Sequence, residues 1–325
     1  MRHVAIGRQA VDSPNPNGGR GGDGPQTRPE GGTYDMKRAK GYLAVLIAGP
    51  AMALATATAS GATPGPSSNG ASGTPATALP AVNMEAVVLA AQIDPRRPDD
   101  TLTPGAKDSV MAVEKALQAE HLLDAKWVDG YFGTQTVSAY AAYQRSLGYT
   151  GLAANGLPGT TSLTKLGQNR YTVTHSISPG ARVQRDGYVV NTRTQAMLTE
   201  AERLLGSRLK LLQGSYNPGG DPASAGTHDG GGVVDISVDG MSAATRTNVA
   251  RALRQVGFAA WIRNPSQADW PWHIHAVAIN DTDMSSPAQH QAGDYYLGLN
   301  GLANQGPDDG PQVPKTTWEE YQRAH

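Results

Sequence analysis

The chain has 325 residues, which is enough for two modest folded domains together with unstructured extensions. Its formal net charge is −1, so the composition gives no sign of a nucleic-acid partner or of electrostatic attachment to a membrane. There is no cysteine, which excludes disulfides, cysteine-ligated zinc and thiol catalysis. Any metal site has to be built from His, Asp and Glu.

Three segments precede the first folded domain. Residues 1–35 are rich in Gly, Pro, Asn and Arg, and we expect them to be disordered and to be an over-extended start before Met36. Residues 36–59 combine a basic beginning, an apolar stretch and the small-residue site Ala57-Thr58-Ala59, which is the pattern of a secretory signal peptide and too short for a stable membrane span. Residues 60–104 are rich in Ala, Thr, Pro, Gly and Ser and are expected to be a disordered linker. The mature protein is therefore expected to be exported.

Residues 105–167 are predicted to form a small three-helix domain. Apolar residues recur at helical spacing over residues 110–122, and two glycine-rich turns, residues 128–136 (VDGYFGTQT) and 155–161 (NGLPGTT), each introduce a further helix. These turns, with Tyr143-Gln144 after the first, resemble the peptidoglycan-binding domain of exported cell-wall enzymes, although Asn155 stands where that family usually has Asp. The resemblance implies attachment to murein. The competing interpretation is a helical spacer.

Residues 171–285 are predicted to form an α+β domain with a mostly antiparallel sheet. Helices are expected at residues 192–205 and 243–256, and strands at residues 209–214, 233–238, 258–262 and 272–279. The helices and strands do not alternate regularly enough for a parallel, doubly wound sheet. Residues 286–325 are expected to be an extension that packs on this domain without adding a core.

A candidate metal site lies in two segments of this second domain, residues 224–237 (SAGTHDGGGVVDIS) and 269–275 (DWPWHIH). Alternation along the two strands puts Asp235 on one face of the first strand, and His273 and His275 on one face of the second. If the strands pair, His275 and Asp235 project to the same side, and His228 arrives from the glycine-rich loop. Two imidazoles and a carboxylate can hold zinc with an open fourth position, as a hydrolytic site requires.

These segments resemble the zinc peptidase superfamily that includes D-Ala-D-Ala carboxypeptidases, murein endopeptidases and hedgehog signalling domains. The resemblance implies that His228, Asp235 and His275 are zinc ligands. It implies that His273 or Asp269 is the catalytic base, with His273 favoured because an ordinary Asp is a weak base at neutral pH. Some carboxypeptidases carry Glu-x-Trp-His with the Glu as base, and Trp270 occupies that Glu position here. On that alignment His273 would replace His275 as a ligand.

The superfamily often carries an arginine in a Ser-Gly-Tyr-Arg stretch before the first motif, and this chain lacks it. Tyr216, Arg263 or Gln213 could supply the missing donor to the substrate. The function expected is that of a secreted, monomeric, zinc-dependent peptidase that cleaves peptidoglycan stem peptides or crosslinks and is held on the cell wall by residues 105–167. The alternatives are a catalytically silent zinc- and peptidoglycan-binding protein and a hedgehog-type interaction domain. The sequence does not choose between endopeptidase and carboxypeptidase activity.

Overall fold

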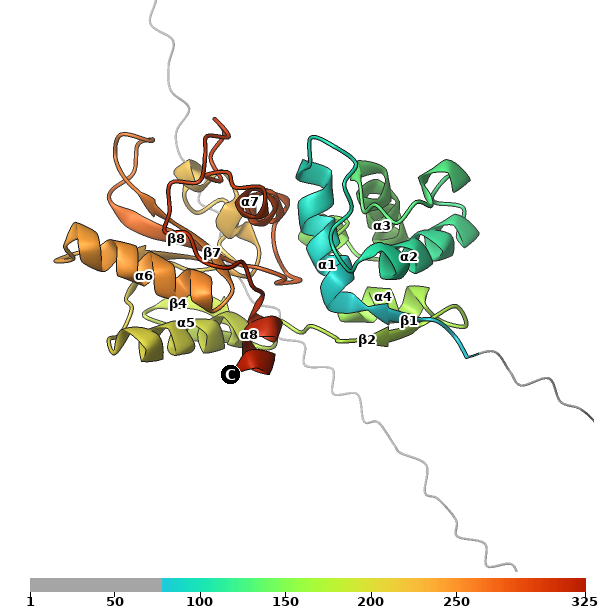
Figure 1. Ribbon diagram of the computed structural model, residues 1–325, viewed down its shortest axis with the longest axis horizontal. Helices are drawn as coiled ribbons and strands as arrows, with labels where there is room; N and C mark the ends of the chain where they lie inside the picture. The colour runs from blue at the N-terminus through green and yellow to red at the C-terminus, as the bar shows by residue number, and fades with distance from the viewer. Residues whose placement is uncertain (1–77) are drawn as a thin grey trace, which may run out of the picture. The chain divides into compact units, whose positions relative to one another are not determined.

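A four-stranded antiparallel sheet with the strand order β5-β6-β8-β7 positions the candidate site. Figure 1 labels its strands β7 and β8. The computed structural model describes residues 78–325, all of which belong to one compact unit, Ser72–His325. The sheet consists of β5 (Leu211–Gln213), β6 (Val233–Ser237), β7 (Phe258–Arg263) and β8 (His273–Ala278). The prediction of an α+β fold with mostly antiparallel pairing is confirmed. Residues 1–35, the predicted signal peptide (residues 36–59) and residues 60–77 of the predicted linker lie outside the described residues.

The register of β6 and β8 follows from their alternating side chains. Asp235 lies opposite His275, and Ser237 lies opposite His273. Asp235 and His275 therefore project to the same side of the sheet, as the sequence predicts. The other face of these strands carries Val234, Ile236 and Ile274, which pack into an apolar cluster with α5 (Thr192–Leu205) and α6 (Ala243–Gln255). Helices α5 and α6 therefore cover one face of the sheet, and the candidate metal-binding side chains Asp235 and His275 lie on the opposite face.

Two smaller sheets complete the strand arrangement. β1 (Ala81–Asn83) and β2 (Thr172–Thr174) pair in parallel, and β3 (Arg182–Arg185) and β4 (Tyr188–Asn191) form an antiparallel pair.

Residues 105–167 contain α2 (Lys107–Ala119), α3 (Thr134–Ser146) and α4 (Thr160–Leu166). The two turns place Gly130 at φ +86° and Gly156 at φ +91°, a conformation that favours glycine. The buried carboxylate of Glu114 accepts hydrogen bonds from the backbone N–H groups of Asp129 and Gly130, at 3.1 and 2.8 Å, and so fixes the first turn.

The prediction of a linker reaching residue 104 is wrong for its last part. Residues 84–93 form α1 (Met84–Ile93), whose Val87 and Val88 are fully buried, and a 3-10 turn (Asp94–Arg96) follows. The composition of the whole segment obscured this short apolar run. A short helix with apolar residues on most sides is stable only when other elements cover it, and α1 packs against α2 and α7.

The C-terminal segment also differs from expectation, because it adds to the core. It contains α7 (Ser286–Tyr296) and α8 (Trp318–Ala324), and Ala288, Ala292 and Tyr295 of α7 are buried. They belong to one apolar cluster that also holds residues of α1, of the helices in residues 105–167 and of the sheet. The two predicted domains therefore share a continuous core.

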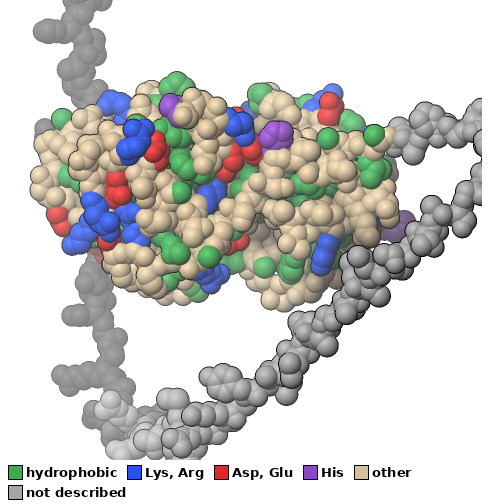
Figure 2. Space-filling model, turned by 90° about the horizontal axis from the view of Figure 1, so that it is seen from below, with side chains coloured by type: hydrophobic (Ala, Val, Ile, Leu, Met, Phe, Trp, Pro, Cys, Tyr) green, Lys and Arg blue, Asp and Glu red, His purple; other side chains and the backbone are tan. Residues whose placement is uncertain are grey.

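The described surface carries charges of both signs. On the face shown in Figure 2, acidic and basic side chains lie among polar and apolar ones. Within residues 78–325 no helix has the length and apolar character needed to cross a bilayer.

The packing of α1 on α7 can be tested at Gly293. A Cβ added there would lie 2.2 Å from the backbone carbonyl oxygen of Gln92, so the two helices would have to separate. We expect Gly293→Ala to lower the free energy of unfolding by about 1–3 kcal/mol, despite the better helix propensity of alanine. Urea unfolding of the protein measures this change. Gly159→Ala is the matched control because its Cβ would meet only the Ser162 hydroxyl, at 4.0 Å, and equal stability of the two variants would contradict the close packing.

Candidate metal centre

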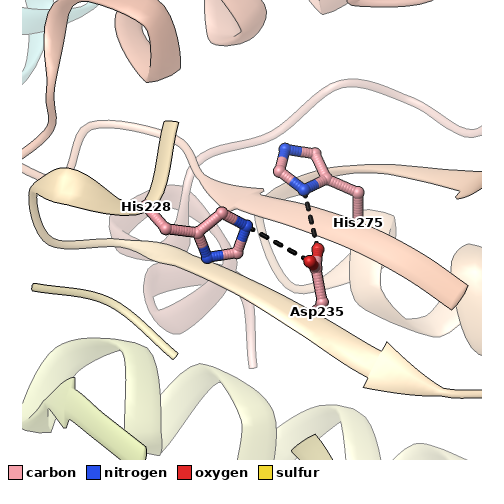
Figure 3. Close-up of side chains that lie close together, drawn as sticks. All are labelled: His228, Asp235 and His275. Atoms are coloured by element: carbon pink, nitrogen blue, oxygen red, sulfur yellow. Dashed lines mark hydrogen bonds and ion pairs between the residues drawn. The ribbon is translucent and has the colours of Figure 1, made fainter. Parts of the chain in front are cut away.

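The side chains of His228, Asp235 and His275 converge on one point, with their potential ligand atoms all within 4.8 Å of one another (Figure 3). His228 Nε2 lies 3.3 Å from Asp235 Oδ2, and His275 Nδ1 lies 2.8 Å from Asp235 Oδ1. The predicted tripod is therefore present in the structure, and its donor set could hold a metal ion.

Local structure fixes where each of the three side chains points. Asp235 and His275 are directly opposite each other on β6 and β8. His228 lies in a 3-10 turn, η5 (Thr227–Asp229), whose backbone is tied to the preceding loop by a hydrogen bond from Asn217 N–H to the His228 carbonyl at 3.0 Å. This hydrogen bond ties the backbone of His228 to the preceding loop.

A backbone carbonyl determines which nitrogen of His228 carries the proton. Nδ1 lies 2.8 Å from the carbonyl oxygen of Gly214, which can only accept, so Nδ1 is the protonated nitrogen. In the neutral ring Nε2 then carries a free lone pair. It is buried, and within the described residues it has no hydrogen-bond partner. A buried lone pair aimed at a carboxylate is the arrangement expected of a metal ligand.

The same reasoning applies to His275 through Gln291 on α7. The Gln291 amide nitrogen donates to the Gly301 carbonyl at 3.1 Å, which turns the amide oxygen toward His275 Nε2 at 2.8 Å. His275 Nε2 therefore donates, and Nδ1 presents a lone pair to Asp235. His275 Nδ1 and Asp235 Oδ1, 2.8 Å apart, are then both acceptors, and a cation bound to both atoms would remove their repulsion.

Electrostatics favour an ionised Asp235 and a neutral His275. Burial would raise the pKa of Asp235, but the two histidines beside the carboxylate outweigh this effect and hold the pKa well below its usual range. Burial lowers the pKa of His275, against the opposing effect of the carboxylate. A carboxylate and an unprotonated imidazole are the forms that bind a divalent cation.

The triad opens into a pocket of about 60 Å³. His273, Arg263 and Gln213 line it, as do three residues that sequence reasoning did not assign to the site, namely Asp221, Trp270 and Gln291. Gln291 was missed because it lies in the segment expected to be an extension. For Trp270 the only sequence signal was its place at the position where some carboxypeptidases carry the Glu of Glu-x-Trp-His.

Two predicted site residues do not reach this pocket. Asp269 is exposed and is not among the pocket's lining residues, because the turn before β8 directs Trp270 inward instead. Tyr216 lines a different cavity, where its hydroxyl donates to Asp283 at 2.8 Å. His273 does line the pocket, with its Nε2 3.8 Å from Asp235 Oδ1.

Replacing Gln291 tests how the tripod is oriented. We expect Gln291→Leu to weaken zinc binding by about 10- to 100-fold, because the leucine cannot accept the Nε2 proton that leaves His275 Nδ1 free. Competition of the protein with a zinc-binding dye gives the affinity. Gln135→Leu, on the exposed surface of α3, is the control. Unchanged affinity in Gln291→Leu would mean that His275 is not held by this hydrogen bond.

No family model, curated protein or solved structure matches this chain.

Proposed function

We propose that this protein is a zinc-dependent peptidase that cleaves peptidoglycan stem peptides or crosslinks. The proposal rests on the two histidines of the triad. Hydrogen bonds place the proton of His228 on Nδ1 and that of His275 on Nε2, so that His228 Nε2 and His275 Nδ1 each direct a lone pair toward Asp235. Three protein ligands beside an accessible pocket are typical of catalytic rather than structural zinc sites. Zinc bound there would supply Lewis acidity and lower the pKa of a bound water to about 7.

His273 is the residue suited to accept the proton of the attacking water. Its Nδ1 lies 2.8 Å from the Pro271 carbonyl, so Nδ1 carries the proton and Nε2 is free to act as a base. His273 lines the pocket on the same face of β8 as His275. Asp269, the other candidate base, is exposed outside the pocket and does not take this role.

Arg263 on β7 is suited to bind the substrate carbonyl or a substrate carboxylate. It is 2% exposed, lines the pocket, and both of its terminal nitrogens lack hydrogen-bond partners among the described residues. Burial lowers its pKa to about 10, so the guanidinium is still charged at neutral pH. A buried cation without partners is costly, and an anionic or strongly polarised group of a substrate would offset that cost. Arg263 therefore takes the role of the arginine missing before the first motif.

The peptidoglycan substrate is inferred from the turn motifs of residues 105–167 and from the peptidase-like motifs. A murein-binding helical segment would keep the enzyme on an insoluble polymer and raise the local substrate concentration. The predicted signal peptide agrees with action outside the cell, as a secreted monomer on the cell wall.

A second candidate is a catalytically silent zinc- and peptidoglycan-binding protein. The position of Asp269 favours it, because no carboxylate other than Asp235 and Asp221 lines the pocket in the described part of the chain. Such a protein would keep the tripod and the murein affinity without turnover.

Incubation of purified murein with the mature protein separates the two candidates. Release of new amines that stops with chelator and returns with zinc supports the peptidase. Zinc binding and murein binding without released amines support the silent protein. Arg263→Gln, with Arg251→Gln as an exposed control, then tests the substrate donor, and the peptidase proposal expects hydrolysis to fall only in the first variant.

A further inference from the structure

A second cavity, the groove, lies on the other side of the turn that carries His228. Its volume is about 390 Å³, within the range of small-ligand sites. Residues of the helical segment, among them Tyr149 and Leu152, form one wall, and the opposite wall includes Arg182, Tyr216, Asp229 and Asp283. The groove and the metal pocket have no lining residue in common.

Consecutive residues of one short turn line the two cavities. Thr227 and His228 line the metal pocket, whereas Asp229 and Gly230 line the groove. The turn is held by the backbone hydrogen bond from Tyr216 N–H to the Gly230 carbonyl at 2.8 Å. Gly230 itself packs so tightly that a Cβ would lie 2.3 Å from the Asp283 carbonyl oxygen. The same short turn thus borders both cavities.

Charged and apolar groups in the groove are arranged to meet a ligand. The Arg182 guanidinium stacks 3.9 Å from the centre of the Tyr216 ring, and within residues 78–325 it forms no ion pair. Tyr216 is held at φ +57° and donates to Asp283, so the stacking platform is fixed. On the other wall the side chain of Leu152 is 42% exposed. The groove thus offers a cation, carboxylates and an apolar contact.

The cation, the carboxylates and the apolar contact of the groove favour one of the ligand types that a cell-wall polymer contains. A polyanion would meet Asp229 and Asp283, and a polycation would meet Arg182. A neutral glycan would desolvate all three charges without matching them, which is unfavourable. A peptide that carries both a free amine and a free carboxylate matches the cation, the carboxylates and the exposed leucine together.

We propose that the groove is a second binding site, which takes a zwitterionic peptide segment continuous with the peptide at the metal centre. This inference rests on the proposed peptidase function and narrows its substrate to stem peptides with a free side-chain amine and a free carboxylate. The carboxylate pairs with Arg182, and the amine pairs with Asp229 and Asp283.

The test is peptide binding to the chelator-treated full-length chain, so that no turnover is needed. The probe is a fluorescent tetrapeptide with one free side-chain amine and a free terminal carboxylate. We expect Arg182→Gln to weaken its binding about two- to fivefold, the effect of losing one exposed ion pair, and Arg251→Gln to leave it unchanged. Asp229→Asn should weaken binding of this peptide and have no effect on a peptide whose amine is acetylated. Arg182 and Arg251 are both exposed, so neither replacement disturbs the core.

Two results would overturn the inference. One is unaltered peptide affinity in both Arg182→Gln and Asp229→Asn. The other is binding of a peptide-free glycan oligomer that depends on Arg182 as strongly as the peptide does, which would make the groove a glycan site. Hydrolysis and zinc affinity are measured separately. Peptide binding that depends on Arg182 in a protein without hydrolysis would contradict only the peptidase function, and hydrolysis without this dependence would contradict only the groove.

Discussion

Replacement of Asp235 by asparagine is expected to weaken zinc binding by more than about 100-fold, because loss of a partner outside the ligand set already costs about 10- to 100-fold. Asparagine keeps the shape of the side chain but removes the negative charge between the two histidine lone pairs. The consequence can be read from thermal unfolding. Zinc at about 100 times its Kd should stabilise the wild-type protein by about 2.7 kcal/mol and the variant hardly at all.

Asp239→Asn is the matched control, since Asp239 follows the same strand and is exposed. It should keep the wild-type zinc affinity and the zinc-dependent rise in Tm. If Asp235→Asn also keeps both, zinc binds without Asp235, and the cluster is a polar network rather than the zinc site.

Replacement of His273 by alanine is expected to lower kcat for murein peptide hydrolysis by about 10²- to 10⁴-fold, the contribution of a general base. The zinc content of the variant should match that of the wild type, because His273 Nε2 lies outside the tripod, 3.8 Å from the nearer Asp235 oxygen. Rates are measured with the zinc-loaded protein, and zinc content by elemental analysis of the same sample.

Asp269→Ala serves as the control for His273→Ala and should keep the wild-type rate, since Asp269 is exposed outside the pocket. Full hydrolysis in His273→Ala would remove this residue from the mechanism. Loss of zinc together with activity would instead assign His273 as a ligand, in agreement with the alternative alignment in which it replaces His275.

Much of the metal centre could be predicted from the sequence because its geometry is encoded locally. Alternation along two short strands fixes which side chains share a face, and antiparallel pairing then brings Asp235 opposite His275. The glycine-rich turn before β6 placed His228 near the same point. Helices α5 and α6 were equally predictable, since their apolar periodicity is strong.

Tertiary structure alone decided which groups surround the tripod. The carbonyl of Gly214 and the amide of Gln291 fix the two histidine tautomers, yet each comes from a separate element whose approach depends on packing. The position of Asp269 outside the pocket likewise depends on how the segment between β7 and β8 folds.

The burial of α1 and α7 is likewise a result of tertiary packing. The sequence by itself determined the strand faces and the candidate metal-binding triad, because side-chain periodicity acts over a few residues. Only the tertiary structure decided that residues expected to be a linker and an extension complete the core, because a short apolar segment becomes a helix only where distant elements cover it.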